Sequence, residues 1–341
     1  MQTFGEQATY PHASITASEG EHSYEVRSLI SLLPHVHFHI VTFTAKPLDA
    51  RAVTLALLTA LIWGGNTVAI KMSLLDVPPF RLIWMRFLVG GLSILVWAGV
   101  SRAPMRVPRE ERSLVVILGL LFSIQIGMFL WGTNLTTAGH AVVLGNIYPV
   151  HVMLLAHVFV PGDRMTARKL IALLLGYLGV VLVFAPQLFG HSGSLLGDIA
   201  VSAASALIAV RTIALNRAVQ RIEPVVLLLA QAIMGTVMFA LVDLFVDRQI
   251  PTHLTARLLL TLAYQGVLIS GFNFSVNLWL LKHYRPSAIS MFYLSTPLFG
   301  VFSSWLILGE PLTAYLLAGA TLVAIGIGLA SLPTRRVRHA A

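Results

Sequence analysis

The sequence predicts an all-helical membrane protein with ten transmembrane helices in two inverted five-helix repeats. Hydrophobic residues make up 57% of the 341-residue chain, and charged residues only 11%. A soluble domain typically carries about 25% charged residues, so most of this surface must face lipid. The charges also lie in short groups between apolar runs, and each run is long enough to cross ~30 Å of hydrocarbon as a helix.

The runs predict helices rather than strands. They lack the alternation of polar and apolar residues that is typical of a membrane barrel, and an open sheet cannot satisfy its edges in lipid. The joints between runs are short and contain proline, glycine or charge, as in DVPPF, PGDR, RIEP and GEP. Such joints suit antiparallel neighbours in a bundle. The expected helices span residues 52–71, 81–100, 114–134, 138–160, 168–186, 198–217, 224–246, 258–281, 287–308 and 312–332.

The two ends of the chain differ from this pattern. Residues 1–45 are mostly polar and rich in turn formers, and we expect a disordered N-terminal extension there. Residues 333–341 form a short basic tail. With the start of the first helix inside, sixteen Lys and Arg fall on inside segments and four on outside ends. This bias predicts that both termini are cytoplasmic, in the plasma membrane of a bacterium (its inner membrane).

The two halves of the chain, 52–187 and 196–332, resemble each other. Because each half has an odd number of helices, the second copy must be inverted in the membrane. Inverted repeats point to alternating access around a site near the bilayer midplane. The matched positions are Pro79 with Pro224, Pro149 with Pro297, Gly162 with Gly309, Asp163 with Glu310, Gly179 with Gly326, Asn66 with Arg211, and Arg86 with Gln231.

These repeats resemble the EamA family of the drug/metabolite transporter superfamily over about residues 52–332. The resemblance rests on WGGNTVAIK (Trp63 to Lys71), Arg86, Pro297, LGEPLT (Leu308 to Thr313), Gly319 and Gly326. The first half departs from the family pattern, because PGD with Asp163 stands where Leu-Gly-Glu is usual. The resemblance implies a ten-helix, inverted-repeat fold that carries small metabolites, often outward. It does not name a substrate.

Charged groups inside apolar helices are the strongest pointers to a site, because each costs at least ~2.5 kcal/mol at the bilayer centre. Arg86 lies in the second turn of the second helix, and Arg211 lies beyond the middle of the sixth. Either arginine could contact an anionic substrate group, or it could snorkel or serve packing. Asn66, the repeat partner of Arg211, is expected near the same axis.

Polar residues on the fourth, eighth and ninth helices extend this candidate substrate site. Tyr148 and His151 share a helix face beside Asn146, and His151 could relay protons or be a satisfied packing residue. Asn could bind substrate or simply join helices. We expect the site to be lined by these residues, by Asn273, Asn277, Tyr293 and Thr296, and by the aromatic walls Trp63 and Trp131.

We therefore expect a secondary transporter that exports a small amino-acid-like, anionic or zwitterionic metabolite. Proton coupling is possible, the bilayer is the other partner, and no cofactor, metal or nucleic acid is expected. No nucleotide-binding Gly-Lys-Ser/Thr loop occurs in the sequence. The alternative is a membrane-embedded enzyme or lipid-handling protein that uses the histidines of the fourth helix. The sequence leaves the oligomeric state open.

Overall fold

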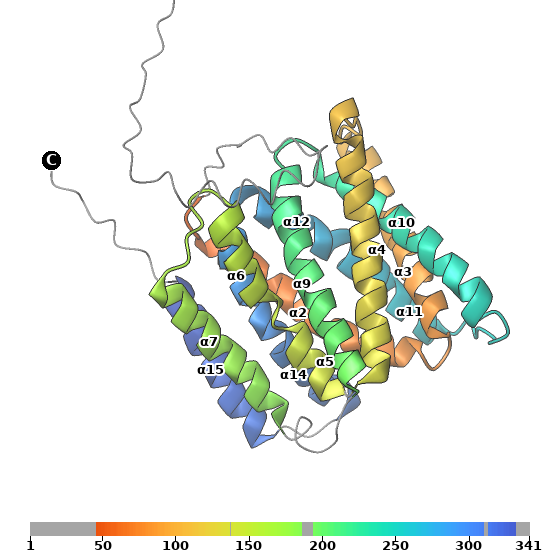
Figure 1. Cartoon of the computed structure of the whole chain (residues 1–341). Coiled ribbons are helices and arrows are strands. Elements are labelled where there is room, and N and C mark those ends of the chain that lie inside the picture. The colour runs from red at the N-terminus through yellow and green to blue at the C-terminus, as the bar shows by residue number, and fades with distance from the viewer. Residues whose placement is uncertain (1–45, 137, 186–193, 310–312, 332–341) are drawn as a thin grey trace, which may run out of the picture. The chain divides into compact units, whose positions relative to one another are not determined.

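A computed structural model describes residues 46–136, 138–185, 194–309 and 313–331. These residues form helices joined by short turns, with no strand among them (Figure 1). The helices are α2 (Ala50–Ser73), α3 (Pro79–Ser101), α4 (Arg112–Leu135), α5 (Ala138–Gly145), α6 (Tyr148–Phe159), α7 (Ala167–Val183), α9 (Leu195–Ala218), α10 (Pro224–Val246), α11 (Ala256–Ala263), α12 (Phe274–His283), α13 (Pro286–Phe292), α14 (Thr296–Leu308) and α15 (Ala314–Ser331), with single turns η1 (Arg109–Glu111) and η3 (Tyr293–Ser295) and the wider turns η2 (Tyr264–Asn273).

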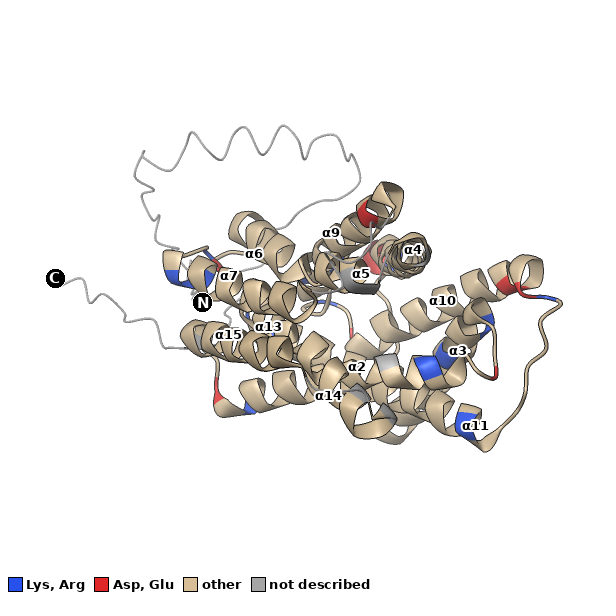
Figure 2. Cartoon of the chain, turned by 90° about the horizontal axis from the view of Figure 1, so that it is seen from below, with Lys and Arg blue, Asp and Glu red and all other residues tan. Residues whose placement is uncertain are grey.

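The all-helical membrane class is confirmed. Within the described ranges, eight helical segments are long and apolar enough to cross a membrane, and α15 is a shorter apolar helix. α7 is also short, with 17 residues. Figure 2 shows charged residues mainly near helix ends, while the helix shafts are almost free of them. The predicted extension 1–45 and basic tail 333–341 lie outside the described residues.

Three of the predicted helices are interrupted near their middle. The fourth helix breaks between α5 and α6, just before Pro149, which has no backbone N–H to donate to the preceding turn. The eighth helix widens into the π-helical η2, where Ser270 donates to the Gln265 carbonyl at 3.0 Å. The ninth tightens at η3, just before Pro297. Interruptions of this kind often mark functional positions in helices.

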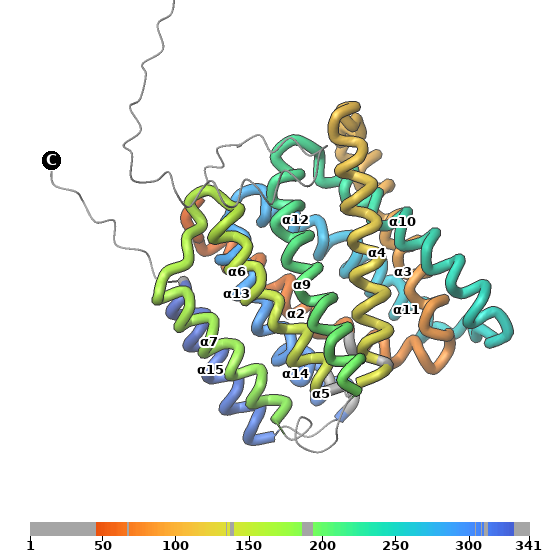
Figure 3. Tube along the Cα trace, viewed as in Figure 1, coloured from red at the N-terminus to blue at the C-terminus, as the bar shows by residue number. Residues whose placement is uncertain are grey.

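The helices pack in close pairs, and two of the pairs join matched positions of the two halves. α7 lies along α15, and α3 lies along α10 (Figure 3). Both pairs run antiparallel. In the first, Gly179 faces Gly319 while Gly176 faces Gly326; in the second, Arg81 pairs with Asp243 while Gly91 faces Ala232.

The α7–α15 pair approaches so closely that only glycine fits at the crossing. A methyl group on Gly179 would come within 2.6 Å of the Gly319 carbonyl oxygen, and one on Gly326 within 2.5 Å of the Ala172 carbonyl oxygen. Gly179 and Gly326 are the matched glycines of the two halves. Small residues at such contacts let helix backbones approach where lipid supplies no hydrophobic driving force.

The turns that precede α7 and α15 also match. Gly162 and Gly309 have φ values of +76° and +71°, which glycine adopts readily. The next residue, Asp163, is buried and accepts hydrogen bonds from the Ser287 hydroxyl at 2.5 Å and from the Ser287 backbone N–H at 3.2 Å. The carboxylate therefore satisfies an N–H at the start of α13, in the other half of the chain, and pairs with Lys169.

The glycine crossing gives a stability prediction. Gly179→Ala should destabilise the fold by about 1–3 kcal/mol, because the added methyl forces the α15 backbone away. Gly328→Ala is the matched control on α15, since a methyl group there meets nothing within 4 Å. Thermal unfolding in detergent micelles should show a lower midpoint for Gly179→Ala alone. Equal midpoints for the two variants would contradict the observed packing.

Candidate functional site

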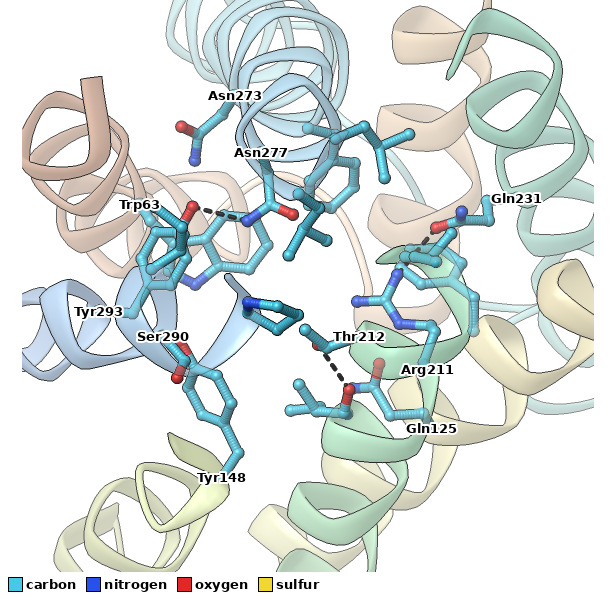
Figure 4. A pocket seen from close by; sticks show the side chains of 18 of the residues that line it. Trp63, Gln125, Tyr148, Arg211, Thr212, Gln231, Asn273, Asn277, Ser290 and Tyr293 are labelled. Carbon is cyan, nitrogen blue, oxygen red and sulfur yellow. Dashed lines mark hydrogen bonds between the residues drawn. The ribbon is translucent and has the colours of Figure 1, made fainter. Parts of the chain in front are cut away.

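A cavity of about 170 Å³ lies between the helices of both halves (Figure 4). Its wall combines aromatic and aliphatic side chains with a few amides, hydroxyls and one arginine. The lining residues are Trp63, Phe122, Gln125, Ile126, Asn146, Tyr148, Ile208, Arg211, Thr212, Leu215, Leu228, Gln231, Asn273, Phe274, Asn277, Leu278, Leu281, Pro286, Ile289, Ser290, Tyr293 and Thr296. A mostly apolar wall with a small number of polar groups is typical of small-molecule sites.

Arg211 is the charged residue of this lining, and no carboxylate is among the residues that form it. Its Nη1 donates to Gln231 Oε1 at 2.8 Å, and its guanidinium lies 4.8 Å from the centre of the Phe122 ring. The buried Nε of Arg211 has no protein partner. Figure 4 shows the guanidinium reaching into the cavity. Its positive charge is therefore neutralised by no protein group of the cavity wall.

Amides and a phenol form the opposite wall. Asn277 Nδ2 donates to the Tyr293 hydroxyl at 2.6 Å, and Asn273 Nδ2 donates to the Thr59 carbonyl at 3.2 Å. Asn273 Oδ1 and Gln125 Oε1 are buried without a protein partner. Buried polar atoms are nearly always hydrogen-bonded in folded proteins, so these unpartnered atoms are candidates for contact with a bound molecule or with water.

The structure places eight of the twelve predicted site residues in the lining of the cavity. They are Trp63, Asn146, Tyr148, Arg211, Asn273, Asn277, Tyr293 and Thr296. The other four lie elsewhere. Asn66 is buried with Oδ1 unpartnered, Arg86 has a buried unpartnered Nε, the Trp131 side chain is 51% exposed, and His151 Nδ1 lies 3.4 Å from the Ser205 hydroxyl. A role in substrate binding stays a prediction for all twelve.

Sequence reasoning did not select several polar lining residues. Gln125, Thr212, Gln231 and Ser290 all line the cavity. Two signals were available: Gln125 is an amide within an apolar run, and Gln231 is the repeat partner of Arg86. The apolar lining residues carry no such signal, because aliphatic side chains occupy every helix face in a protein that contacts lipid.

The chain joints gather at two ends, which we name here. The basic end holds the joints around residues 46–51, 102–112, 160–169, 217–223 and 282–287, and contacts such as Asp49 with Tyr284 and Asp163 with Ser287 join them. The opposite end holds the joints around residues 74–81, 136–140, 194–198 and 247–257. The cavity runs from mid-helix residues such as Trp63 and Thr296 towards Leu281 and Pro286, next to the basic end.

A polar network joins the two halves at the opposite end. Arg81 pairs with Asp243 at 3.1 Å and donates to the Ile250 carbonyl at 2.6 Å, while Trp84 Nε1 donates to Asp243 at 2.9 Å. Asp247 accepts from the Phe80 N–H at 2.9 Å. These contacts join the start of α3 to the end of α10.

A second ion pair lies beside this network. Asp76, in the joint after α2, accepts hydrogen bonds of 2.8 Å from Arg257 and from the Thr255 hydroxyl. The bonds from Arg257 lower the pKa of Asp76 to about 2, from an ordinary value near 3.9. Asp76 is therefore ionised at any physiological pH.

The histidines of the fourth helix do not assemble a catalytic centre. His151 contacts Ser205, and His157 Nδ1 accepts from the Met165 N–H at 3.2 Å. No group of three or more potential metal ligands occurs in the described part of the chain. Neither the His151–Ser205 contact nor His157 belongs to the lining of the cavity.

Comparison with known proteins decides between a carrier and an enzyme. The model of the EamA-like transporter family matches the chain twice, over residues 50–185 and 195–332. The chain belongs to this family. The resemblance read from WGGN, Arg86 and LGEPLT is thereby confirmed, as is the prediction that the protein is a membrane transporter and not an enzyme.

Similar proteins carry the same general assignment. The uncharacterised transporter YoaV of Bacillus subtilis is 26% identical over 78% of this chain and 92% of its own length. A probable amino-acid metabolite efflux pump of Salmonella typhimurium is 25% identical over 80% and 92%. A solved crystal structure covers 83% of this chain and 97% of its own, with a TM-score of 0.73 and 19% identity, which shows a shared fold alone.

The Asp76–Arg257 pair gives a pH prediction. Because folding lowers the pKa of Asp76, the pair stabilises the fold fully above about pH 4 and progressively less as the pH falls towards 2. Asp76→Asn should therefore melt below the wild type at pH 6, with the difference shrinking between pH 4 and 2. Melting curves of both proteins in detergent across this range test it. A difference that grows as the pH falls would contradict the assignment.

Proposed function

We propose that this family member is a secondary transporter that exports a small carboxylate-bearing, amino-acid-like metabolite through the described cavity by alternating access. The observation that carries the proposal is the position of Arg211. It is a buried guanidinium in a membrane-embedded cavity whose described lining contains no carboxylate. A substrate carboxylate would supply the missing negative charge.

The physical argument rests on the cost of burying an unpaired charge. An isolated ion in a low-dielectric interior is costly unless it is paired and hydrogen-bonded. The Arg211 guanidinium gives one hydrogen bond to Gln231 and retains further N–H donors. A planar guanidinium can bind a carboxylate through two parallel hydrogen bonds. An anionic or zwitterionic molecule therefore fits better than a cation, which Arg211 would repel.

The rest of the wall suits an amino-acid-like compound. The Asn277 amide and the Tyr293 hydroxyl could contact an ammonium or polar group, while Trp63 and Phe274, with ring centres 5.3 Å apart, offer an apolar surface. The name of the Salmonella relative, an amino-acid metabolite efflux pump, points to the same class. Coupling to protons is part of the proposal, with His151 the candidate relay.

We propose ten spans in two inverted repeats, 52–187 and 196–332, as the frame for alternating access. Two features support this. The family model matches the chain once in each half. The matched helices α3 and α10 run antiparallel, as do α7 and α15, which is the relation that an inverted copy produces. The clustering of the basic joints at one end supports a bacterial inner-membrane location with both termini in the cytoplasm.

Transport in proteoliposomes tests the proposal. Vesicles are loaded with a defined mixture of isotope-labelled amino acids and 2-oxo acids, and efflux is followed by mass spectrometry. At least one carboxylate compound should leave the vesicles that contain the protein faster than it leaves equally loaded vesicles without the protein. Arg211→Gln should slow that flux roughly tenfold to a hundredfold, because a charge-assisted hydrogen bond is lost. Arg211→Lys should fall between, since the ammonium keeps the charge but not the planar pair of donors.

The matched control is Arg109→Gln, which removes an equal charge from an exposed residue that does not line the cavity. Its flux should equal that of the wild type. Wild-type flux in Arg211→Gln would remove Arg211 from the mechanism. Faster efflux of cationic amines than of carboxylates would overturn the substrate class.

A further inference from the structure

An arginine and an amide of the second half, Arg211 and Gln231, meet in the cavity lining, while the residues at the matched positions of the first half lie outside it. Arg211 on α9 and Gln231 on α10 are hydrogen-bonded in the cavity wall. Their matched positions, 145 residues earlier in both cases, are Asn66 on α2 and Arg86 on α3. Each half therefore supplies one guanidinium and one amide, with the two residue types exchanged between the two helices.

Other residue pairs share the same spacing and lie at helix contacts or in the cavity lining. Gly90 on α3 and Gly235 on α10 are also 145 residues apart. Both stand where helices touch, because a methyl group on Gly90 would come within 2.3 Å of Ser270 Cβ, and one on Gly235 within 2.8 Å of the Phe87 ring. Trp63 and Ile208 share the same spacing, and both line the cavity. The match is therefore structural as well as sequential.

Asn66 and the Nε atom of the half-buried Arg86 lie inside the protein without hydrogen-bond partners. Asn66 is 7% exposed, and its Oδ1 has no hydrogen-bond partner. The Arg86 Nε is likewise buried and unpartnered, and no acidic residue pairs with Arg86 among the described contacts. Leaving such atoms unsatisfied destabilises a fold, so these two side chains have a requirement that the observed state does not meet.

A layer of aromatic rings separates Arg86 from the cavity. The Arg86 guanidinium lies 5.0 Å from the Phe87 ring centre, and that of Arg211 lies 4.8 Å from the Phe122 ring centre. The two rings pack edge to face with centres 5.3 Å apart. Only Phe122 lines the cavity. The two arginines therefore lie against a shared aromatic pair, one at the cavity and one behind it.

We infer that Asn66 and Arg86 form a second carboxylate-binding position, which contacts substrate when the protein opens at the opposite end. This inference rests on the proposed function. In the other state, each inverted half would adopt the conformation that its counterpart has here. Asn66 would then take the place of Arg211 in the cavity lining, and Arg86 the place of Gln231. The substrate carboxylate passes from one guanidinium to the other during transport. Each arginine is then paired with the carboxylate in the conformation in which that arginine lines the cavity.

Side-specific thiol labelling tests this inference, because the chain has no cysteine. Single variants Asn66→Cys and Thr212→Cys are treated with the impermeant anion 2-sulfonatoethyl methanethiosulfonate, in right-side-out and in inside-out vesicles during turnover of the amino-acid mixture. Thr212→Cys should react from the face at the basic end, and Asn66→Cys from the opposite face. Full reaction of both after denaturation, and monodisperse behaviour in detergent, control for thiol content and folding.

The outcomes separate this inference from the proposed function. Reaction of Asn66→Cys from the same face as Thr212→Cys, or from neither face while Thr212→Cys reacts, overturns the second position alone. Failure of Thr212→Cys to react from either face contradicts the transport cavity itself, and the inference with it. As a second measurement, Arg86→Gln should slow net flux about tenfold. Binding of the carboxylate from the face at the basic end, where Thr212→Cys reacts, should stay near the wild-type level. Equal losses of binding and flux would assign Arg86 a purely structural role.

Discussion

A guanidinium in the interior of a membrane protein must meet negative charge or hydrogen-bond acceptors, because the surrounding medium supplies neither. Arg211 meets one amide oxygen and the face of one aromatic ring, and no carboxylate of the cavity wall. The unpartnered atoms of Gln125 and Asn273 belong to residues that line the same cavity. These unmet requirements are the basis of our proposal that the cavity prefers a molecule that brings its own carboxylate over a cation.

Contacts between the two halves of the chain lie at both ends of the structure and between them. At the opposite end, polar contacts such as Arg81 with Asp243 join α3 to α10. At the basic end, Asp163 joins the turn before α7 to the start of α13. Between the ends, the backbones of α7 and α15 approach closely where Gly179 faces Gly319, and Val183 and Val323 pack against these glycines. Hydrogen bonds and ion pairs at the two ends, with close glycine contacts between α7 and α15, are compatible with the proposed alternating exposure of a central site.

The helix positions could be predicted from the sequence because a helix that crosses lipid needs a long run of apolar residues. The expected helix 224–246, for example, matches α10 at both ends. Arg211 and Asn277 could be selected because polar groups are rare in such helices. The interruption at η2 has no proline at its position and carries no signal in the sequence that we could use. Arg86 shows a different limit: its rarity in an apolar helix marked it for the site, but it lies outside the cavity lining. The rarity of a charge does not tell which of two arginines faces a cavity.

The central claim is that the charge of Arg211 selects substrates by their carboxylate, and paired ligands test it most directly. Binding to the purified protein is measured by calorimetry for each amino acid, its uncharged-carboxyl amide and its decarboxylated amine. The account predicts that at least one amino acid binds, that its amide and its amine bind at least about tenfold more weakly, and that Arg211→Gln removes the difference. Equal affinity of the wild type for the acid and its amide would contradict it.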